Sequence, residues 1–443
     1  MEEKKTVLRA ILVLALIMTP IVGFFVWQSR ANTRGTIYIM ADGSVYPSTV
    51  AITREGNVYT LTADISEQIT VERDNLVIDG ASHVLQGTGM GHTSEWGKGI
   101  VFSGRNNVTI KNMVIQKCGQ GIRFEYSSNI VISKNNITNN YDGIIGKGCS
   151  NNIISENNIS NNDGGIVLGS SSNNNIISWN NITKNHEGIC LSGSSNQNFI
   201  SRNNIADNFY DKTFGHGIWI ETSNHNIISR NNITRNSGQG IWLRASSNNT
   251  ISWNNIMGND PYNIRLNEDY YDIERGNFSS YNIISSNTVS LSPYGVWLSN
   301  YSKYNTLSGN NVTNNNEGIT VWSSNNTISG NKIANNREGL ILSSSKNNTV
   351  SYNNIATNIN YGMKLLDSSN NIIYHNNFAN NHEQVYCQNS VNIWDKGYTD
   401  GGNYWSNYLG VDLDVDGIGD IPYVIDSYNL DSQFLAFSYW DRF

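Results

Sequence analysis

The chain has 443 residues, of which 29 are Lys or Arg and 36 are Asp or Glu, so its net charge is −7. This mildly acidic balance, without a basic stripe, argues against a nucleic-acid partner. Charged residues make up only 15% of the chain, and apolar residues recur regularly, which argues against a disordered tract rich in Gly and Asn.

The N-terminus contains an apolar run over residues 10–27, preceded by Lys4, Lys5 and Arg9. Its length is close to the minimum for a helix that crosses a bilayer, and the basic residues favour a cytoplasmic N-terminus. We expect residues 1–34 to form a cytoplasmic tail and a signal anchor. The protein would then be a single-pass membrane protein with an extracellular or periplasmic body. A cleaved signal peptide is the alternative.

The next segment, residues 35–98, lacks the repeat that follows it but contains two strand-like runs, at 58–62 and 75–80. The first coil of a stacked-strand protein needs a cover, because an exposed strand edge recruits other chains. We expect residues 35–98 to form an N-terminal cap and the first coils.

Residues 99–384 contain a repeat marked by asparagines, most of them 21 to 23 residues apart. Each is followed two residues later by an apolar residue, and Gly begins many of the units. A fixed period of this length predicts a repeat architecture. The marker residues are Asn112, Asn135, Asn157, Asn180, Asn203, Asn231, Asn254, Asn287, Asn310, Asn331, Asn353 and Asn376.

Each repeat unit, such as residues 240–257, holds two short runs of alternating apolar and polar residues separated by turn formers. Strands this short bury an apolar face only if the units stack, which places Ile on Ile and Asn on Asn. The Asn residues would form a ladder of side-chain amides. The pattern predicts an all-β fold, a single-stranded right-handed parallel β-helix, with capping segments after an N-terminal transmembrane helix.

The tail, residues 385–443, is rich in aromatic residues and would form a C-terminal cap. It also contains alternating carboxylates followed by Gly417, which resemble the front of a calcium loop. The usual distal glutamate is replaced by Tyr423, so a solvated acidic turn is the alternative. The predicted ligands of a structural calcium ion are Asp412, Asp414, Asp416, Ile418 through its carbonyl, and Asp420.

Several segments together resemble the NosD-like, pectin-lyase-like β-helix repeat proteins of the archaeal cell-surface type. The matching segments are the N-N-I-T and N-N-I-S units, residues 71–80, 394–405 and 416–423. The resemblance covers nearly the whole exported chain and implies the right-handed β-helix fold. Members of this group include carbohydrate-binding proteins, sugar hydrolases and a copper-accessory protein. Copper delivery requires clustered His, Met or Cys, and the seven histidines here are scattered, so we see no copper signature.

One candidate site is an aromatic stripe on successive coils, at the outward position after the residue that follows Gly. It comprises Trp219, Trp242, Arg265 and Trp297. Neighbouring coils place such side chains one strand spacing apart, which suits the apolar faces of sugar rings. Packing between coils, which only stabilises the sheet, is the alternative.

A second candidate site is the polar column just before each Gly. Crowded carboxylates acquire separated pKa values, as an acid and a base require. The alternative is that turn positions simply favour Asp, Glu and His. The catalytic candidates are Asp142, Asp163, Glu187 and His216, with His186, Glu317 and Glu338 in or beside the same column.

Two further features concern the surface. An insertion at residues 267–275 lies either at a binding face or in a tolerated loop. Eleven N-x-S/T sequons suggest a glycoprotein, although the repeat motif itself generates sequons. Their asparagines are Asn107, Asn136, Asn158, Asn181, Asn232, Asn248, Asn277, Asn300, Asn311, Asn325 and Asn347.

These features favour a non-catalytic surface protein that binds a polysaccharide or other glycan, or that builds the cell envelope. The alternatives are a lyase, hydrolase or epimerase acting on acidic glycans, and an accessory factor for metalloenzyme maturation. The expected partners are a glycan and, through residues 10–27, the membrane. The oligomeric state stays open.

Overall fold

The computed structural model describes residues 35–87, 97–209, 215–268, 278–398, 400–413 and 415–436. The predicted anchor at residues 1–34 therefore lies outside the described residues, as do most of the insertion and Asp414. Among the residues that are described, no helix has the length and apolar character that a membrane crossing needs.

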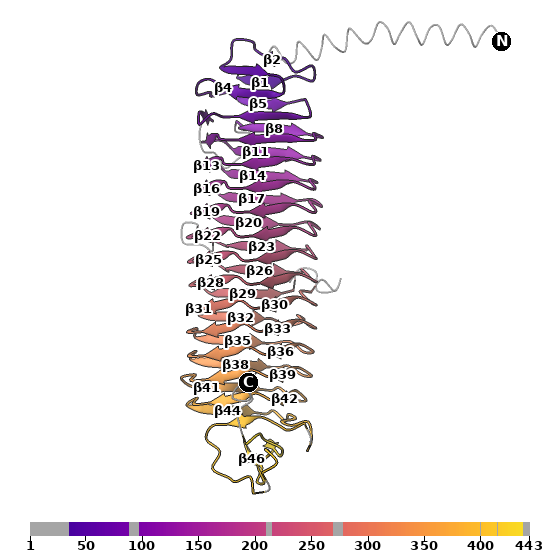
Figure 1. Cartoon of the computed structure of the whole chain (residues 1–443), viewed down its shortest axis with the longest axis vertical. Coiled ribbons are helices and arrows are strands. Elements are labelled where there is room, and N and C mark those ends of the chain that lie inside the picture. The colour runs from indigo at the N-terminus through magenta and orange to yellow at the C-terminus, as the bar shows by residue number, and fades with distance from the viewer. Residues whose placement is uncertain are drawn as a thin grey trace, which may run out of the picture.

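The described chain forms a rod of stacked coils with three long sheets along its sides (Figure 1). Each coil of the repeat region contributes one strand to each sheet, and the pairing between coils is parallel. Antiparallel pairs occur near the two ends: Thr36–Ile39 with Val45–Tyr46, Ile52–Glu55 with Val58–Leu61, and Tyr423–Val424 with Leu430–Asp431. This arrangement confirms the predicted all-β parallel β-helix.

Sheet A has 16 strands and contains the strands that begin near the recurring glycines. In spatial order they are β2 (Val45–Tyr46), β1 (Thr36–Ile39), β5 (Gln68–Val71), β8 (Ile100–Ser103), β11 (Gln120–Glu125), β14 (Asp142–Lys147), β17 (Gly164–Gly169), β20 (Glu187–Leu191), β23 (Ile218–Glu221), β26 (Ile241–Arg244), β29 (Tyr262–Asn267), β32 (Tyr294–Leu298), β35 (Glu317–Val321), β38 (Glu338–Ser343), β41 (Tyr361–Leu366) and β44 (Glu383–Gln388).

Sheet B has 15 strands, and most of those in the repeats end in serine. They are β3 (Ile52–Glu55), β4 (Val58–Leu61), β6 (Leu76–Asp79), β9 (Val108–Lys111), β12 (Val131–Ser133), β15 (Ile153–Ser155), β18 (Ile176–Ser178), β21 (Phe199–Ser201), β24 (Ile227–Ser229), β27 (Thr250–Ser252), β30 (Ile283–Ser285), β33 (Thr306–Ser308), β36 (Thr327–Ser329), β39 (Thr349–Ser351) and β42 (Ile372–Tyr374).

Sheet C has 14 strands, and a two-stranded sheet of β46 (Tyr423–Val424) and β47 (Leu430–Asp431) lies in the tail. From the C-terminal end, sheet C comprises β45 (Tyr404–Trp405), β43 (Asn377–Ala379), β40 (Asn354–Ala356), β37 (Lys332–Ala334), β34 (Asn311–Thr313), β31 (Thr288–Ser290), β28 (Asn255–Met257), β25 (Asn232–Thr234), β22 (Asn204–Ala206), β19 (Asn181–Thr183), β16 (Asn158–Ser160), β13 (Asn136–Thr138), β10 (Val114–Gln116) and β7 (Val84–Gln86).

The core is a set of apolar columns that run along the rod. On sheet C, for example, Ile137, Ile159, Ile182 and Ile205 pair in register on successive coils, and each is fully buried. Strands of three residues bury only one or two side chains each, so each strand depends on the coils above and below it. The burial of the stacked column, rather than the propensity of any one strand, stabilises the rod.

The predicted Asn ladder is present and buried at the corner between sheets B and C. Asn135 donates from Nδ2 to Oδ1 of Asn157 at 3.0 Å, and the same bond recurs on each coil as far as Asn403. Asn112 is an exception to the prediction. The register places Met113, not Asn112, beside Asn135, because the polar residue of that coil falls one position earlier, where the backbone is left-handed.

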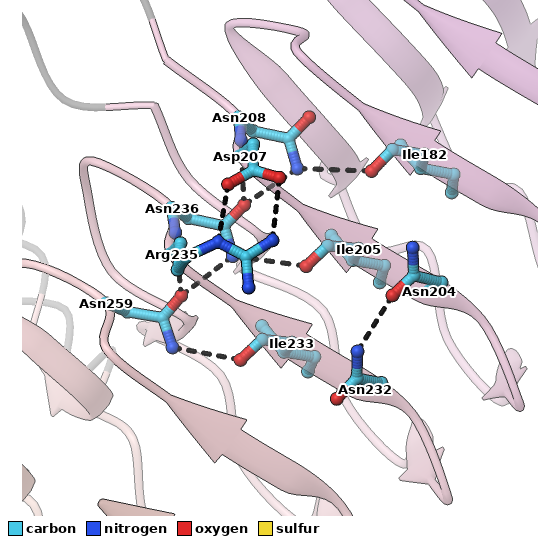
Figure 2. A network of polar contacts seen from close by, with 10 residues as sticks. All are labelled: Ile182, Asn204, Ile205, Asp207, Asn208, Asn232, Ile233, Arg235, Asn236 and Asn259. Atoms are coloured by element: carbon cyan, nitrogen blue, oxygen red, sulfur yellow. Dashed lines mark hydrogen bonds and ion pairs between the residues drawn. The ribbon is translucent and has the colours of Figure 1, made fainter. Parts of the chain in front are cut away.

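Two more buried Asn ladders occupy the other corners, and the marker positions do not include them. Figure 2 shows part of one, in which Asn208, Asn236 and Asn259 bond in sequence and each donates to an Ile carbonyl. The second ladder includes Asn140, Asn162, Asn185, Asn208, Asn236 and Asn259 and then Asn315, Asn336, Asn358 and Asn381. The third runs through Asn152, Asn175, Asn198, Asn226, Asn249, Asn282, Asn305, Asn326, Asn348, Asn371, Asn392 and Asn429.

The C-terminal tail terminates the ladders with its own polar groups. Asp431 Oδ2 accepts from the main-chain N–H of Asn403 at 2.7 Å and from Trp405 Nε1 at 2.9 Å. Asp426 accepts from the Asn429 side chain, which ends the third ladder. Trp394 and Trp405 are almost fully buried over the last coil. Unpaired buried polar groups at the end of the rod would be costly, and the tail supplies their partners.

Candidate functional site

Both candidate sites of the repeat region lie on the outer face of sheet A. Asp142 pairs in register with Gly164, which pairs with Glu187, and the pairing of Ile189 with Ile218 places His216 beside Glu187. The three tryptophans and the arginine of the stripe form the adjacent outward column, in the order Trp219, Trp242, Arg265 and Trp297. The rod therefore joins the polar column and the stripe into one surface.

Glu187 is the centre of the polar cluster. His186 approaches Asp163 with Nδ1 at 3.2 Å from Oδ1, and its Nε2 lies 3.8 Å from Glu187 Oε1. His216 is only 7% exposed and accepts from the main-chain N–H of Gln239 at Nδ1, at 3.1 Å. Four ionisable groups from three coils thus converge here.

The fold raises the pKa values of two carboxylic acids in the polar column. Burial raises the pKa of Glu187 to about 8, against the opposing charge of His186 and with the help of Asp163. Burial also raises the pKa of Asp142 to about 6, partly offset by a hydrogen bond from Gln120. At neutral pH Glu187 is therefore mostly protonated, while Asp142 is mostly ionised.

The imidazole of His216 carries no charge near neutral pH. Burial lowers the pKa of His216 to about 4, and the neighbouring charges of His186 and Arg265 act in the same direction. A neutral acid at Glu187 and a neutral imidazole at His216 stand on adjacent coils. This pair is chemically able to donate and to accept a proton.

The rings of the stripe stack on one another along the rod. Trp219 and Trp242 are nearly parallel, at 12°, with centroids 5.3 Å apart. The guanidinium of Arg265 lies over Trp242 at 5.6 Å and over Trp297 at 5.0 Å. Neighbouring side chains therefore cover much of the ring faces. The indole N–H of Trp219 is buried, and that of Trp242 donates to Asn267 Oδ1. Stacking of a sugar ring on these side chains, as predicted from the sequence, would require exposed ring faces.

Four of the buried side-chain atoms without a partner lie on this same surface. Glu187 Oε2, Trp219 Nε1, Gln239 Oε1 and Arg265 Nε have no hydrogen-bond partner among the described residues. They lie on four consecutive coils, those of β20, β23, β26 and β29. Such groups are rare in folded proteins and call for a ligand or water.

The structure also adds residues that the sequence did not single out. Gln239 and Tyr262 continue the column of Glu187 and His216, and Cys190 precedes Trp219 in the stripe. Their positions in the repeat could have identified them. Each lies at the same distance in sequence from an inward-facing residue as a predicted site residue does. The residue types differ along the column, so residue type alone did not identify these positions.

The acids farther along the polar column form a separate group. Glu317 accepts from the Thr320 hydroxyl at 2.7 Å, and Glu338 lies 3.4 Å from Lys364 Nζ. The coils that carry His216, Gln239, Tyr262 and Tyr294 separate them from Glu187. These two acids already have partners in the rod and do not share the cluster around Glu187.

The predicted calcium loop is described except for Asp414. Asp412 accepts from the main-chain N–H of Gly417 at 3.0 Å, Asp416 from that of Ile418 at 2.8 Å, and Asp420 from that of Leu413 at 2.6 Å. The carboxylates thus stabilise the turn through the backbone. Calcium binding by this loop stays a prediction.

The comparisons with known proteins concern the fold and the family. The family model described as "Periplasmic copper-binding protein (NosD)" matches residues 31–214 and 275–410. The chain belongs to the NosD family. A second model, "Right handed beta helix region", matches residues 180–326 and agrees with the predicted hand of the solenoid. The search of curated proteins found no match.

Solved structures with the same architecture include three polysaccharide-related or phage proteins. The periplasmic alginate epimerase AlgG is 16% identical, with a TM-score of 0.43 over 62% of this chain and 80% of that one. The AlgE4 A-module, a mannuronan C-5 epimerase of Azotobacter vinelandii, is 14% identical, with a TM-score of 0.43 over 74% and 91%. The Dettilon tailspike protein is 18% identical, with a TM-score of 0.40 over 67% and 57%. At these identities the likeness concerns the fold alone.

The family description names copper, and a copper site in this chain would require a cluster of suitable donor side chains. Among the described residues, no group of three or more His, Cys, Asp or Glu is arranged to hold a metal ion. Cys118, Cys149, Cys190 and Cys387 are free thiols, and the first two are buried. The described residues therefore do not fit a copper site.

Proposed function

We propose that this NosD-family protein binds a polysaccharide along the outer face of sheet A. The observation that supports the proposal is the row of four unpartnered polar atoms on consecutive coils, at Glu187, Trp219, Gln239 and Arg265. In the three buried Asn ladders, by contrast, stacking pairs amide with amide. At this row it leaves donors and acceptors that a polyhydroxylated chain satisfies.

The spacing of these atoms favours a polymer over a small ligand. Successive coils lie about 4.8 Å apart, so the row extends over roughly 14 Å along the rod. Trp219 and Arg265 offer N–H donors and Gln239 offers a carbonyl oxygen, whereas a protonated Glu187 offers both functions. A run of sugar hydroxyls can meet such a mixed row, because each hydroxyl both donates and accepts.

The change Trp219→Phe tests the proposal with the smallest disturbance. It removes the unpartnered N–H and keeps an aromatic ring stacked on Trp242. We expect the affinity of the purified full chain for its best polysaccharide on a glycan array to fall about fivefold, the factor for one hydrogen bond of about 1 kcal/mol. Trp322→Phe is the matched control, since Trp322 lies beyond the row on the coil of β35. Unchanged affinity in Trp219→Phe would contradict binding at this row.

A second candidate function is acid–base catalysis on the bound glycan. The observation that favours it is the protonated Glu187, with a pKa of about 8, beside a neutral His216. Glu187 would serve as the proton donor, so turnover would decline as the pH rises through about 8. The measurement is the release of reducing ends or of unsaturated uronate from an acidic polysaccharide. Glu187→Gln should abolish it, and turnover that survives this change would exclude the role.

We also propose that the body is displayed outside the cytoplasm on a membrane anchor formed by residues 10–27, and that some sequons carry glycans there. The apolar run and its basic flank support this placement. Protease treatment of intact cells should degrade the body. A body that fractionates with soluble cytoplasmic proteins after lysis would contradict the anchor.

A further inference from the structure

We propose that the corner between sheets B and C carries a second polysaccharide-binding surface, which selects chains with acidic groups. The surface, here called the corner column, consists of Trp179, Arg202, Arg230 and Trp253. It lies away from sheet A and goes beyond the function proposed above, because it uses different residues and a different face of the rod.

The four residues occupy equivalent positions on four consecutive coils. Each follows the serine that ends its sheet B strand, and those serines pair in register from β18 to β27. Each has a left-handed backbone, with φ between 56° and 61°. The turn therefore directs every one of these side chains to the same edge of the rod, and the column spans roughly 14 Å at the usual strand spacing.

The tryptophans of the corner column are far more exposed than those of sheet A. Trp179 is 58% exposed and Trp253 is 63% exposed, whereas Trp219 and Trp242 are partly buried against each other. Left-handed turns favour Gly and Asn, and a bulky ring there gives up stability without gaining burial. Two indoles exposed to this extent are suited to the apolar face of a sugar ring.

The arginines between the tryptophans supply positive charge without a counter-charge. Arg202 lies over the Trp179 ring at 4.9 Å, and Arg230 follows on the next coil. Neither arginine forms an ion pair with another described residue. Glu156, at the equivalent position one coil before Trp179, pairs instead with Lys134 at 3.7 Å. Like charges on adjacent strands repel each other. An anion held between the two guanidinium groups removes this cost and forms charge-assisted hydrogen bonds.

The neighbouring face of sheet B widens the proposed binding surface. Ile176, Phe199 and Ile227 are each about two-fifths exposed, at 40%, 40% and 42%, and a row of serines separates them from the corner column. Apolar side chains, hydroxyls and guanidinium groups thus occupy neighbouring positions on the surface. A second copy of this chain is a poorer occupant, because a symmetric contact that brings two corner columns together opposes their arginines.

The test uses the full chain and affinity electrophoresis in gels that contain polygalacturonate, heparin or uncharged hydroxyethyl cellulose. We expect retardation by at least one of the two acidic polymers and not by the uncharged one. The double variant Arg202→Gln/Arg230→Gln should weaken this retardation about tenfold, and so should Trp179→Ala/Trp253→Ala. Arg337→Gln and Trp322→Ala are matched controls on other parts of the surface and should bind as the unmodified chain does.

Several outcomes would overturn the proposal. They are full retardation of the double arginine variant, equal retardation by the uncharged polymer, and equally tight binding of double-stranded DNA through the same arginines. Sedimentation that shows a dimer lost in Trp179→Ala/Trp253→Ala would assign the surface to self-association instead. This proposal can fail independently of the proposed binding on sheet A. Trp219→Phe leaves the corner column intact, so it should not alter retardation that depends on Arg202 and Arg230.

Discussion

The interior of the rod and the outer face of sheet A are built from the same repeat but treat polar groups in opposite ways. In the interior, Asn231 donates to Asn254 at 3.0 Å and to the Ile200 carbonyl at 2.9 Å. On the outer face, Trp219 Nε1 and Gln239 Oε1 are buried without a partner. Strict repetition satisfies each polar group with its own copy on the next coil. Where the residue type changes from coil to coil, that pairing is lost and polar atoms are left without a partner.

The largest expected effect comes from breaking the interior ladder. Asn231→Ala leaves the Asn203 main-chain and side-chain N–H groups, both bonded to Asn231 Oδ1, without an acceptor inside the rod. We expect a loss of about 3 kcal/mol in the free energy of unfolding, measured by urea denaturation.

Asn232→Ala is the matched control for this change. Asn232 follows Asn231 directly but belongs to an exposed outer ladder, where it donates to Asn204 at 2.8 Å (Figure 2). Water replaces that bond, so we expect a loss below about 1 kcal/mol. Equal losses in the two variants would show that burial does not distinguish the ladders.

The next effect concerns the pH dependence of stability on the outer face. Glu187 has an ordinary pKa of 4.5 and a pKa of about 8 in the fold. The folded state therefore holds this proton more tightly than the unfolded chain. Its contribution is complete below about pH 4.5 and is lost as the pH rises to about 8.

Glu187→Gln should flatten this decline, as followed by the melting temperature across that pH range. Asp142, whose pKa rises from 3.8 to about 6, has the same sign at lower pH and should leave a smaller decline in the variant. Glu156→Gln on the exposed corner serves as the control. An unchanged profile in Glu187→Gln would refute the buried, protonated state of this acid.

The smallest effect concerns the C-terminal loop, where the carboxylates already bond to the backbone. Asp412, Asp416 and Asp420 each accept main-chain N–H groups, so a calcium ion would gain less than at a loop with unengaged oxygens. We expect chelation with EDTA to lower the melting temperature by about 2 °C. Asp416→Asn should abolish the response, and a melting temperature that ignores calcium would remove the loop from the candidate metal sites.

The sequence supported the fold because the stacking pattern is local to each repeat. Residues such as Ile159 and Asn157 recur at fixed offsets, and both became columns. The prediction that Asn112 belongs to the ladder was wrong by one residue, because Met113 occupies the ladder position of that coil. The same reasoning also missed the other two Asn ladders, whose members lie in turns that looked merely polar.

The candidate site was only partly accessible from the sequence. Register placed Trp219 and Trp242 together, but whether their faces cover each other depends on the side-chain rotamers and on Arg265. The corner column escaped notice because Trp179 and Trp253 are three coils apart, separated in the sequence by arginines on uneven intervals.

The sequence by itself determined that the chain is a stacked β-helix, since the period, the inward Ile positions and the turn residues are properties of each unit alone. The tertiary structure decided which polar atoms find partners, which rings are covered and which acids keep their protons. These depend on neighbours 21 to 33 residues away, as the ladder bonds from Asn310 to Asn331 and from Asn254 to Asn287 illustrate. Burial and pairing arise only when the coils are in contact, so no single repeat contains them.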